Sequence, residues 1–154
     1  MGLAGVNWKQ GIKTTVAAAI CLVLARTFRL HQGYWASISA IVVVQSRITE
    51  TWSVARDRIV GTAIGALLGW GAVIFWHGSP WIYAATILLC MTIPPMAGFR
   101  NGARFAGIAA SIVMLIPNDL PHWKVATGRF YEVSLGMLVA LAVSQTLWRE
   151  APAD

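Results

Sequence analysis

Six apolar runs follow one another along the 154 residues, and most charged residues fall between them. A run of ~20 apolar residues can cross a bilayer as a helix, so six crossings take about 120 residues. Only 12% of the residues are charged, against ~25% in a soluble domain, which leaves too few polar side chains to cover a soluble surface. We therefore expect an all-α membrane protein with six transmembrane helices in a single domain. These helices cover about residues 12–28, 34–45, 59–76, 81–97, 105–116 and 130–148.

The basic residues indicate how the chain is oriented in a membrane. The net charge is +6, but nucleic-acid binding would require a basic stripe on a soluble fold. Here the basic residues stand at the ends of apolar runs, where an excess of them marks the cytoplasmic side. With the N-terminus inside, eight of the twelve Lys and Arg residues lie on the inner side. Both termini are therefore expected in the cytoplasm, and membrane lipids rather than nucleic acid are expected as partners.

Two of the runs, 34–45 and 105–116, are too short to cross a bilayer. About 12 residues give a helix of ~18 Å, against ~30 Å of hydrocarbon. The two runs also align with each other: residues 36–44 match 106–114 at four positions of nine, 70 residues apart. Either the chain contains an internal repeat, or the short helices merely tilt or thin the bilayer locally.

The repeat predicts an inverted architecture. Its copies cover about residues 8–76 and 80–148, and each contains three spans, so the second copy enters the membrane upside down. At a separation of 71 residues, Arg58 pairs with Arg129 and Gly65 with Gly136. Inverted repeats with short segments in matching places are typical of transporters, and the substrate site lies at those segments.

The residues after each short run predict two long helices. Thr49 can cap a helix with Glu50 in its first turn, so the third helix is expected to extend from about Thr49 to Trp76. Asn118 or Asp119 can cap the sixth helix, with Pro121 in its opening turn. The positive N-terminal ends of such helices attract anions.

Glycines mark the faces on which these helices are expected to pack. Gly61, Gly65 and Gly69 repeat every four residues, and Gly136 lies on a similar small-residue stripe of the last helix. This spacing lets helix backbones approach closely. A dinucleotide-binding loop is excluded because no strand precedes the glycines.

The stretch from Tyr34 to Gly69 resembles the signature of the fusaric acid resistance-like family. The resemblance rests on Tyr34-Trp35-Ala36, Val42-Val43-Val44-Gln45, Thr51, Ala55, Arg58-Ile59-Val60-Gly61-Thr62, Gly65 and Gly69, and on Glu132, Leu135-Gly136, Leu141, Ser144 and Leu147-Trp148 near the end. This integral membrane domain is shared with bacterial aromatic acid exporters and, distantly, with aluminium-activated malate transporters.

The family resemblance implies six helices, cytoplasmic termini and the export or conductance of organic anions across the inner membrane. Relatives commonly have a proline where this chain has Ser46, which predicts a milder break after the second helix. Larger members carry two such bundles, so a homo-oligomer, most simply a dimer, is expected here.

Five residues are candidates for binding an organic anion substrate. Arg47, Arg58, Arg104 and Arg129 are the cationic candidates, although each could instead orient the chain or contact lipid headgroups. Gln45 could hydrogen-bond a carboxylate or serve as a cap. Arg58 is the strongest candidate, because the family signature and the repeat both include it.

Glu132 is the one carboxylate within a predicted apolar span. It could carry a proton coupled to export, or simply pair with Arg129 one turn earlier. No nucleophile–base pair, metal-ligand spacing or phosphate loop is present in the sequence, so neither an enzyme nor a metal or other cofactor is expected. Two functions stay open: a transporter or channel for organic anions, aromatic carboxylates above others, and a non-transporting scaffold or partner subunit.

Overall fold

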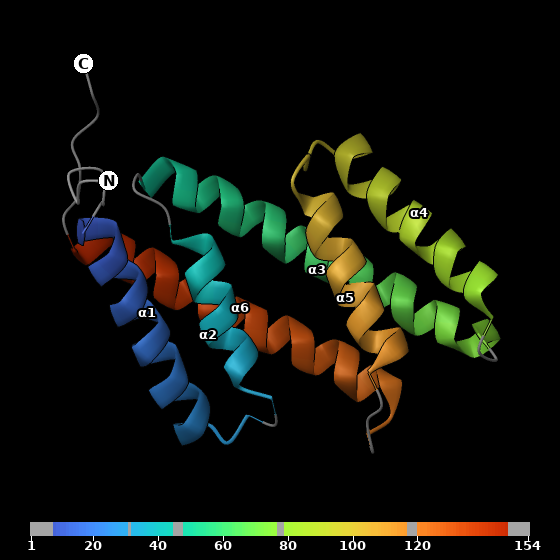
Figure 1. Ribbon diagram of the computed structural model, residues 1–154, viewed down its shortest axis with the longest axis horizontal. Helices are drawn as coiled ribbons and strands as arrows, with labels where there is room; N and C mark the ends of the chain where they lie inside the picture. Colours follow the sequence, from blue (N-terminus) through green and yellow to red (C-terminus); the bar gives the residue numbers. More distant parts are fainter. Residues whose placement is uncertain (1–7, 31, 45–47, 77–78, 117–119, 148–154) are drawn as a thin grey trace, which may run out of the picture. The chain divides into compact units, whose positions relative to one another are not determined.

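The computed structural model describes residues 8–30, 32–44, 48–76, 79–116 and 120–147. This part of the chain forms six α-helices and contains no strand (Figure 1). The helices are α1 (Trp8–Thr27), α2 (Tyr34–Val43), α3 (Ile48–Trp76), α4 (Pro80–Met96), α5 (Gly102–Leu115) and α6 (His122–Thr146). The predicted all-α class with six helices is confirmed.

The shortest and the longest helices are those that the sequence predicts. Helices α2 and α5 have 10 and 14 residues, while α3 and α6 have 29 and 25. Within the described residues, two segments are both long and apolar enough to cross a membrane: Glu50–Phe75 in α3 and His122–Thr146 in α6. Helix α3 begins one residue before the predicted Thr49 and has Glu50 in its first turn, where a negative charge is favourable.

Several helix ends differ from the prediction. Helix α1 begins at Trp8, four residues before the first apolar run, because the helix also includes the polar residues that precede this run. Helix α6 begins at His122, so Pro121 lies just before the helix rather than in its opening turn. The Pro121 carbonyl accepts hydrogen bonds from the backbone N–H groups of Lys124 and Val125, at 2.8 and 3.3 Å. The expected caps, 118 and 119, lie outside the described residues.

Helices α1 and α4 end in the same kind of turn. After α1, the N–H of Leu30 donates to the carbonyl of Ala25 at 3.0 Å, around Arg29 with φ +50°. After α4, the N–H of Phe99 donates to the carbonyl of Pro94 at 2.9 Å, around Gly98 with φ +87°. Both are Schellman turns, which close a helix through a left-handed residue. Each turn leads into a short helix.

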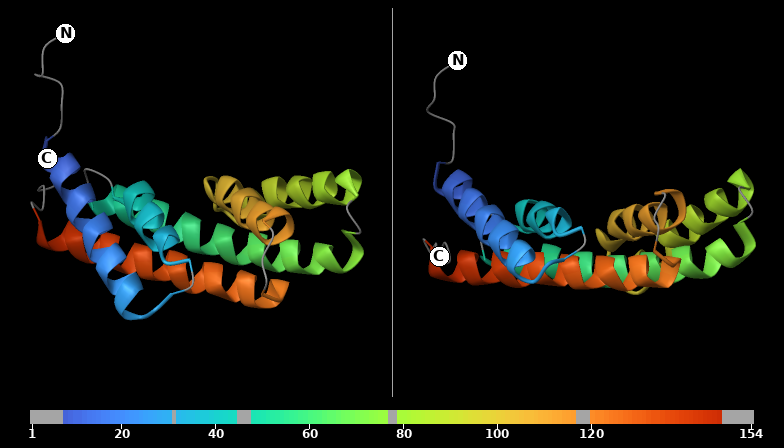
Figure 2. Two further views of the ribbon diagram at one scale, coloured as in Figure 1. Left: turned by 60° about the horizontal axis from the view of Figure 1, so that its bottom comes forward. Right: turned by 90° about the horizontal axis from the view of Figure 1, so that it is seen from below.

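The chain divides into two compact units. The first unit contains residues 1–55 and 134–154, and the second contains residues 56–133. In the first unit α1 packs against α2, and in the second α4 packs against α5, as the views of Figure 2 show. Each of the long helices α3 and α6 is divided between the two units.

The two short helices, one in each unit, bury residues at equivalent positions. Helix α2 buries Ala36, Ser39, Ala40 and Val43. Helix α5 buries, among others, the residues 70 positions later: Ala106, Ala109, Ala110 and Val113. The alignment detected in the sequence therefore coincides with the buried face of both helices, which is the behaviour expected of an internal repeat.

Candidate functional site

Two consecutive residues of α3, Arg56 and Asp57, contact the turn between α4 and α5. Asp57, which is largely buried, accepts hydrogen bonds at Oδ2 from the backbone N–H of Asn101 at 3.2 Å and from its side-chain Nδ2 at 3.1 Å. Asn101 directly precedes α5, so the carboxylate lies at the positive end of that helix. Arg56 places its guanidinium 4.7 Å from the ring centroid of Phe99. These contacts hold the start of α5 against α3.

Arg58 lies inside the apolar part of α3 and is only 6% exposed. Its guanidinium carbon stands 4.7 Å from the centroid of the Phe105 ring on α5. The negative face of an aromatic ring attracts a cation, and more strongly where water is excluded. A charged side chain within an apolar membrane segment is costly to bury and generally has a functional role. Arg58 is therefore the centre of the candidate site.

A glycine stripe brings the backbones of α3 and α5 into contact beside this arginine. A methyl group on Gly61 or Gly65 would overlap the carbonyl oxygen of Gly102 or Ala106, and one on Gly69 would lie 2.9 Å from the Cα of Ala110. The contacts advance by four residues on both helices, so α3 and α5 run in the same direction. Because these glycines have no side chains, Phe105 can lie beneath the guanidinium of Arg58.

The first unit contains a matching contact. A methyl group on Gly136 of α6 would overlap the carbonyl oxygen of Ala36 in α2. Gly136 lies 71 positions after Gly65, and Ala36 lies 70 positions before Ala106. The pairs that align in sequence therefore make equivalent backbone contacts, each within its own unit.

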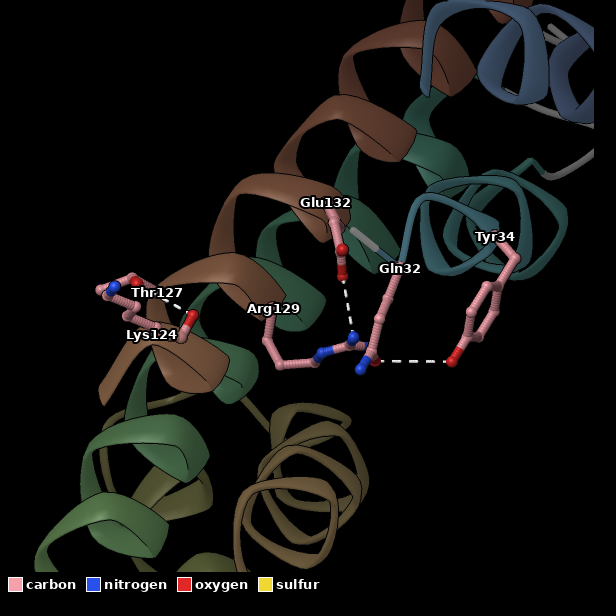
Figure 3. A network of polar contacts seen from close by, with 6 residues as sticks. All are labelled: Gln32, Tyr34, Lys124, Thr127, Arg129 and Glu132. Carbon is pink, nitrogen blue, oxygen red and sulfur yellow. Dashed lines mark hydrogen bonds and ion pairs between the residues drawn. The ribbon is translucent and has the colours of Figure 1, made fainter. Parts of the chain in front are cut away.

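Arg129 and Glu132 form an ion pair on α6. The Nη2 of Arg129 lies 3.1 Å from the Oε2 of Glu132, and the two side chains are 4% and 5% exposed (Figure 3). Their separation of three residues places both on one face of the helix. Of the two expectations for Glu132, the pairing with Arg129 is the one observed.

The remaining candidates have different surroundings. Arg104 is exposed on α5 and lines a groove between α4 and α5. Arg58, Arg104 and Arg129 belong to the same unit, but the described contacts of Arg58 and Arg129 are with Phe105 and Glu132 respectively. Gln45 and Arg47 lie outside the described residues.

Sequence reasoning missed the residues that support Arg58. The charged Arg56-Asp57-Arg58 run was visible at the start of an apolar segment, and it could have indicated a buried carboxylate. Nothing local indicated Phe105 or Asn101, because each contacts α3 across more than 40 positions of the chain.

Comparison with known proteins places this helical arrangement in a family. A family model described as fusaric acid resistance protein-like matches residues 18–143. The chain belongs to this family. The match extends from α1 to α6 and includes the buried arginines and the glycine stripe.

Curated relatives of this fusaric acid resistance-like chain are much longer proteins. The uncharacterized transporter YdhK of Salmonella typhimurium is 30% identical over 146 residues, which cover 86% of this chain and 21% of YdhK. YdhK of Escherichia coli is 26% identical over 142 residues, with the same coverage. The inner membrane protein YccS of Escherichia coli is 23% identical over 144 residues, which cover 92% of the chain and 20% of YccS. The chain thus spans about a fifth of these relatives. No solved structure matches it significantly.

Proposed function

We propose that the chain forms a six-helix domain of a bacterial inner-membrane transporter that moves organic anions, aromatic or other carboxylates, outward from the cytoplasm. Family membership supports membrane transport, as does the description of YdhK as a transporter and of YccS as an inner membrane protein. The observation that carries the proposal is the buried guanidinium of Arg58 within an apolar segment of α3.

Arg58 has the chemistry that carboxylate recognition requires. A guanidinium presents two parallel N–H donors to the two oxygens of a carboxylate, and each charge-assisted hydrogen bond contributes ~1.5–3 kcal/mol. Phe105 supports one face of this group at 4.7 Å and thereby limits the directions in which its donors can point. The apolar surroundings strengthen the attraction, since a charge is screened less there than in water.

The Arg129–Glu132 pair is a second element of the proposed mechanism. Breaking a buried ion pair is unfavourable, because each partner would remain charged in an apolar environment. Protonation of Glu132 would weaken its ion pair with Arg129, while binding of an anion to Arg129 would favour protonation of Glu132. We propose that this exchange couples a proton to export.

An inverted repeat of residues 8–76 and 80–148 would supply the path of the anion across the membrane. The shared buried register of α2 and α5, and the equivalent Gly65–Ala106 and Gly136–Ala36 contacts, support the repeat. Two copies of three spans make an even total, which would leave both termini on one side of the membrane, and the distribution of basic residues predicts that this side is the cytoplasm. The alternative is a scaffold that uses its glycine faces only for assembly.

The test compares two arginines of α3 that both lie 4.7 Å from a phenylalanine ring. Arg58 is buried and Arg56 is exposed, so Arg56→Lys is the matched control for Arg58→Lys. Lysine keeps the charge but lacks the planar fork. We expect Arg58→Lys to lower benzoate efflux from reconstituted vesicles about tenfold, equivalent to ~1.4 kcal/mol. Arg56→Lys should have little effect, and neither substitution should change membrane insertion or elution as the expected dimer. Unchanged efflux in Arg58→Lys would refute the role of Arg58, and no efflux from the unmodified chain would favour the scaffold.

A further inference from the structure

A groove of about 440 Å³ lies between α4 and α5 in the second unit. Helix α4 contributes Tyr83 and Met91 to its wall, and α5 contributes Arg104, Gly107 and Ser111. The side chain of Met91 packs closely against Gly107 in the middle of the groove, because a methyl group on Gly107 would lie 2.7 Å from the Cε of Met91. The volume falls in the range of small-molecule sites, ~300–1,000 Å³.

One end of the groove is polar. The hydroxyls of Tyr83 and Ser111 lie 2.9 Å apart, and the Oγ of Ser111 donates to the carbonyl of Gly107 at 2.8 Å. Because a serine hydroxyl has a single proton, Tyr83 must then donate to Ser111. A serine oxygen has two lone pairs, so Ser111 has the capacity to accept a second hydrogen bond. This end of the groove suits a ligand group that donates a hydrogen bond.

The other end is cationic, and the middle is apolar. Arg104 is exposed and lies seven positions before Ser111, which corresponds to ~10 Å along α5. Between these two positions the wall is formed by Met91, Ile87 and Ile108. The groove thus presents a positive charge, an apolar stretch and a hydrogen-bond acceptor in order along one helix.

We propose that this groove binds an elongated organic anion, with its carboxylate on Arg104, its apolar body against Gly107 and Met91, and a hydroxyl or amino group at Ser111. The identity of the occupant as a transported solute rests on the proposed function. A lipid acyl chain would fill the apolar middle, but it has no group to offer the polar end. This groove should favour ligands that are long enough to reach from Arg104 to Ser111 and that carry a hydrogen-bond donor at the far end. The Arg58 site alone makes neither demand on its ligand.

The first unit contains an uncharged counterpart between α1 and α2. This groove of about 490 Å³ is lined on α2 by Tyr34, Ser37 and Ile41, which lie 70 positions before Arg104, Gly107 and Ser111. Tyr34 here donates to the side chain of Gln32 at 3.4 Å (Figure 3). Since a tyrosine replaces the cation, this groove should not hold a carboxylate, and it provides the control.

Binding to the purified full chain in nanodiscs of neutral lipid tests the proposal. The probes are 4-hydroxycinnamate and cinnamate, which differ only in the distal hydroxyl, and the measurement is isothermal titration calorimetry. We expect 4-hydroxycinnamate to bind about tenfold more tightly than cinnamate. Arg104→Gln should weaken both acids at least tenfold, while Ser111→Ala should weaken 4-hydroxycinnamate and leave cinnamate within twofold.

The control for Ser111→Ala is Ser37→Ala, since the Oγ of Ser37 also donates to a backbone carbonyl, that of Ala18 at 3.1 Å. Ser37→Ala should leave both affinities unchanged. Equal affinities for the two acids, or binding that is insensitive to Arg104→Gln, would overturn the proposal. Competition by added phosphatidylglycerol that disappears in Arg104→Gln would assign the groove to lipid instead.

Efflux measurements separate this inference from the proposed function. If the unmodified chain exports 4-hydroxycinnamate and Arg104→Gln exports it equally well, the groove has no part in transport although the transport function stands. If the unmodified chain shows no efflux but retains binding that depends on Arg104 and Ser111, the transport function fails and the binding site stands.

Discussion

The closest backbone approach described in the second unit predicts what a single methyl group should do. In Gly65→Ala the new Cβ overlaps the carbonyl oxygen of Ala106 and lies 2.6 Å from its Cα, whereas carbon atoms in ordinary contact are ~3.5–4.0 Å apart. Backbone atoms cannot swing aside as the end of a side chain can. Helices α3 and α5 must therefore separate by about 1 Å at this point, and overpacking of this kind costs ~1–3 kcal/mol.

A second glycine of the same helix isolates this cost. Gly71 has no heavy atom within 4 Å of its ideal Cβ position, so Gly71→Ala introduces no overlap. Alanine is favoured over glycine in a helix interior by ~0.5–1 kcal/mol, and both substitutions gain that preference. The difference between the two variants therefore measures the overlap alone, and we expect about 2 kcal/mol.

Thermal unfolding in detergent, followed by tryptophan fluorescence, measures the difference. A change of 1 kcal/mol shifts the midpoint of a chain of this size by ~2–4 °C. Gly65→Ala should therefore unfold at least ~4 °C below Gly71→Ala, and Gly136→Ala should behave like Gly65→Ala because its methyl overlaps the Ala36 carbonyl. Equal midpoints for Gly65→Ala and Gly71→Ala would refute the close approach of α3 and α5.

Two further predictions concern stability. Arg29→Gly should raise the unfolding midpoint by at least ~2 °C, because a left-handed φ of +50° costs a non-glycine residue ~1–2 kcal/mol; an unchanged midpoint would contradict this. Arg129→Gln and Glu132→Gln should each lower the midpoint strongly, since removal of one partner of a buried pair costs ~3–5 kcal/mol. The double variant should be more stable than the sum of the two losses implies, and strict additivity in this cycle would show that the pair contributes nothing.

The sequence predicts those parts of the fold that depend on nearby residues. The start of α3 was expected at Thr49 and lies at Ile48, because Glu50 and the helical spacing that follows are local signals. The Arg129–Glu132 pair was one of two stated expectations, since a separation of three residues is a local relation on any helix. The inward face of α5 follows from its alignment with α2.

Contacts between distant residues could not be predicted in the same way. The hydrogen bonds from Asn101 to Asp57 join residues 44 positions apart, and the position of Phe105 under Arg58 depends on how closely α3 and α5 pack. The sequence places Arg104 among the anion candidates but contains no signal that Tyr83 and Met91 of α4 line the same groove. Such relations arise only when the helices are packed.

The glycine contacts carry a consequence for how such a chain could arise. Gly65 lies within residues 8–76 and contacts Ala106 within residues 80–148, while Gly136 lies within residues 80–148 and contacts Ala36 within residues 8–76. Under the proposed repeat, the short helix that accommodates each glycine is encoded in the other copy. Under the same proposal, an ancestral three-helix peptide would have needed a second copy of itself from the outset. The difference between Tyr34 and Arg104, which lie 70 positions apart in the sequence, would then mark the divergence of the two copies after their fusion.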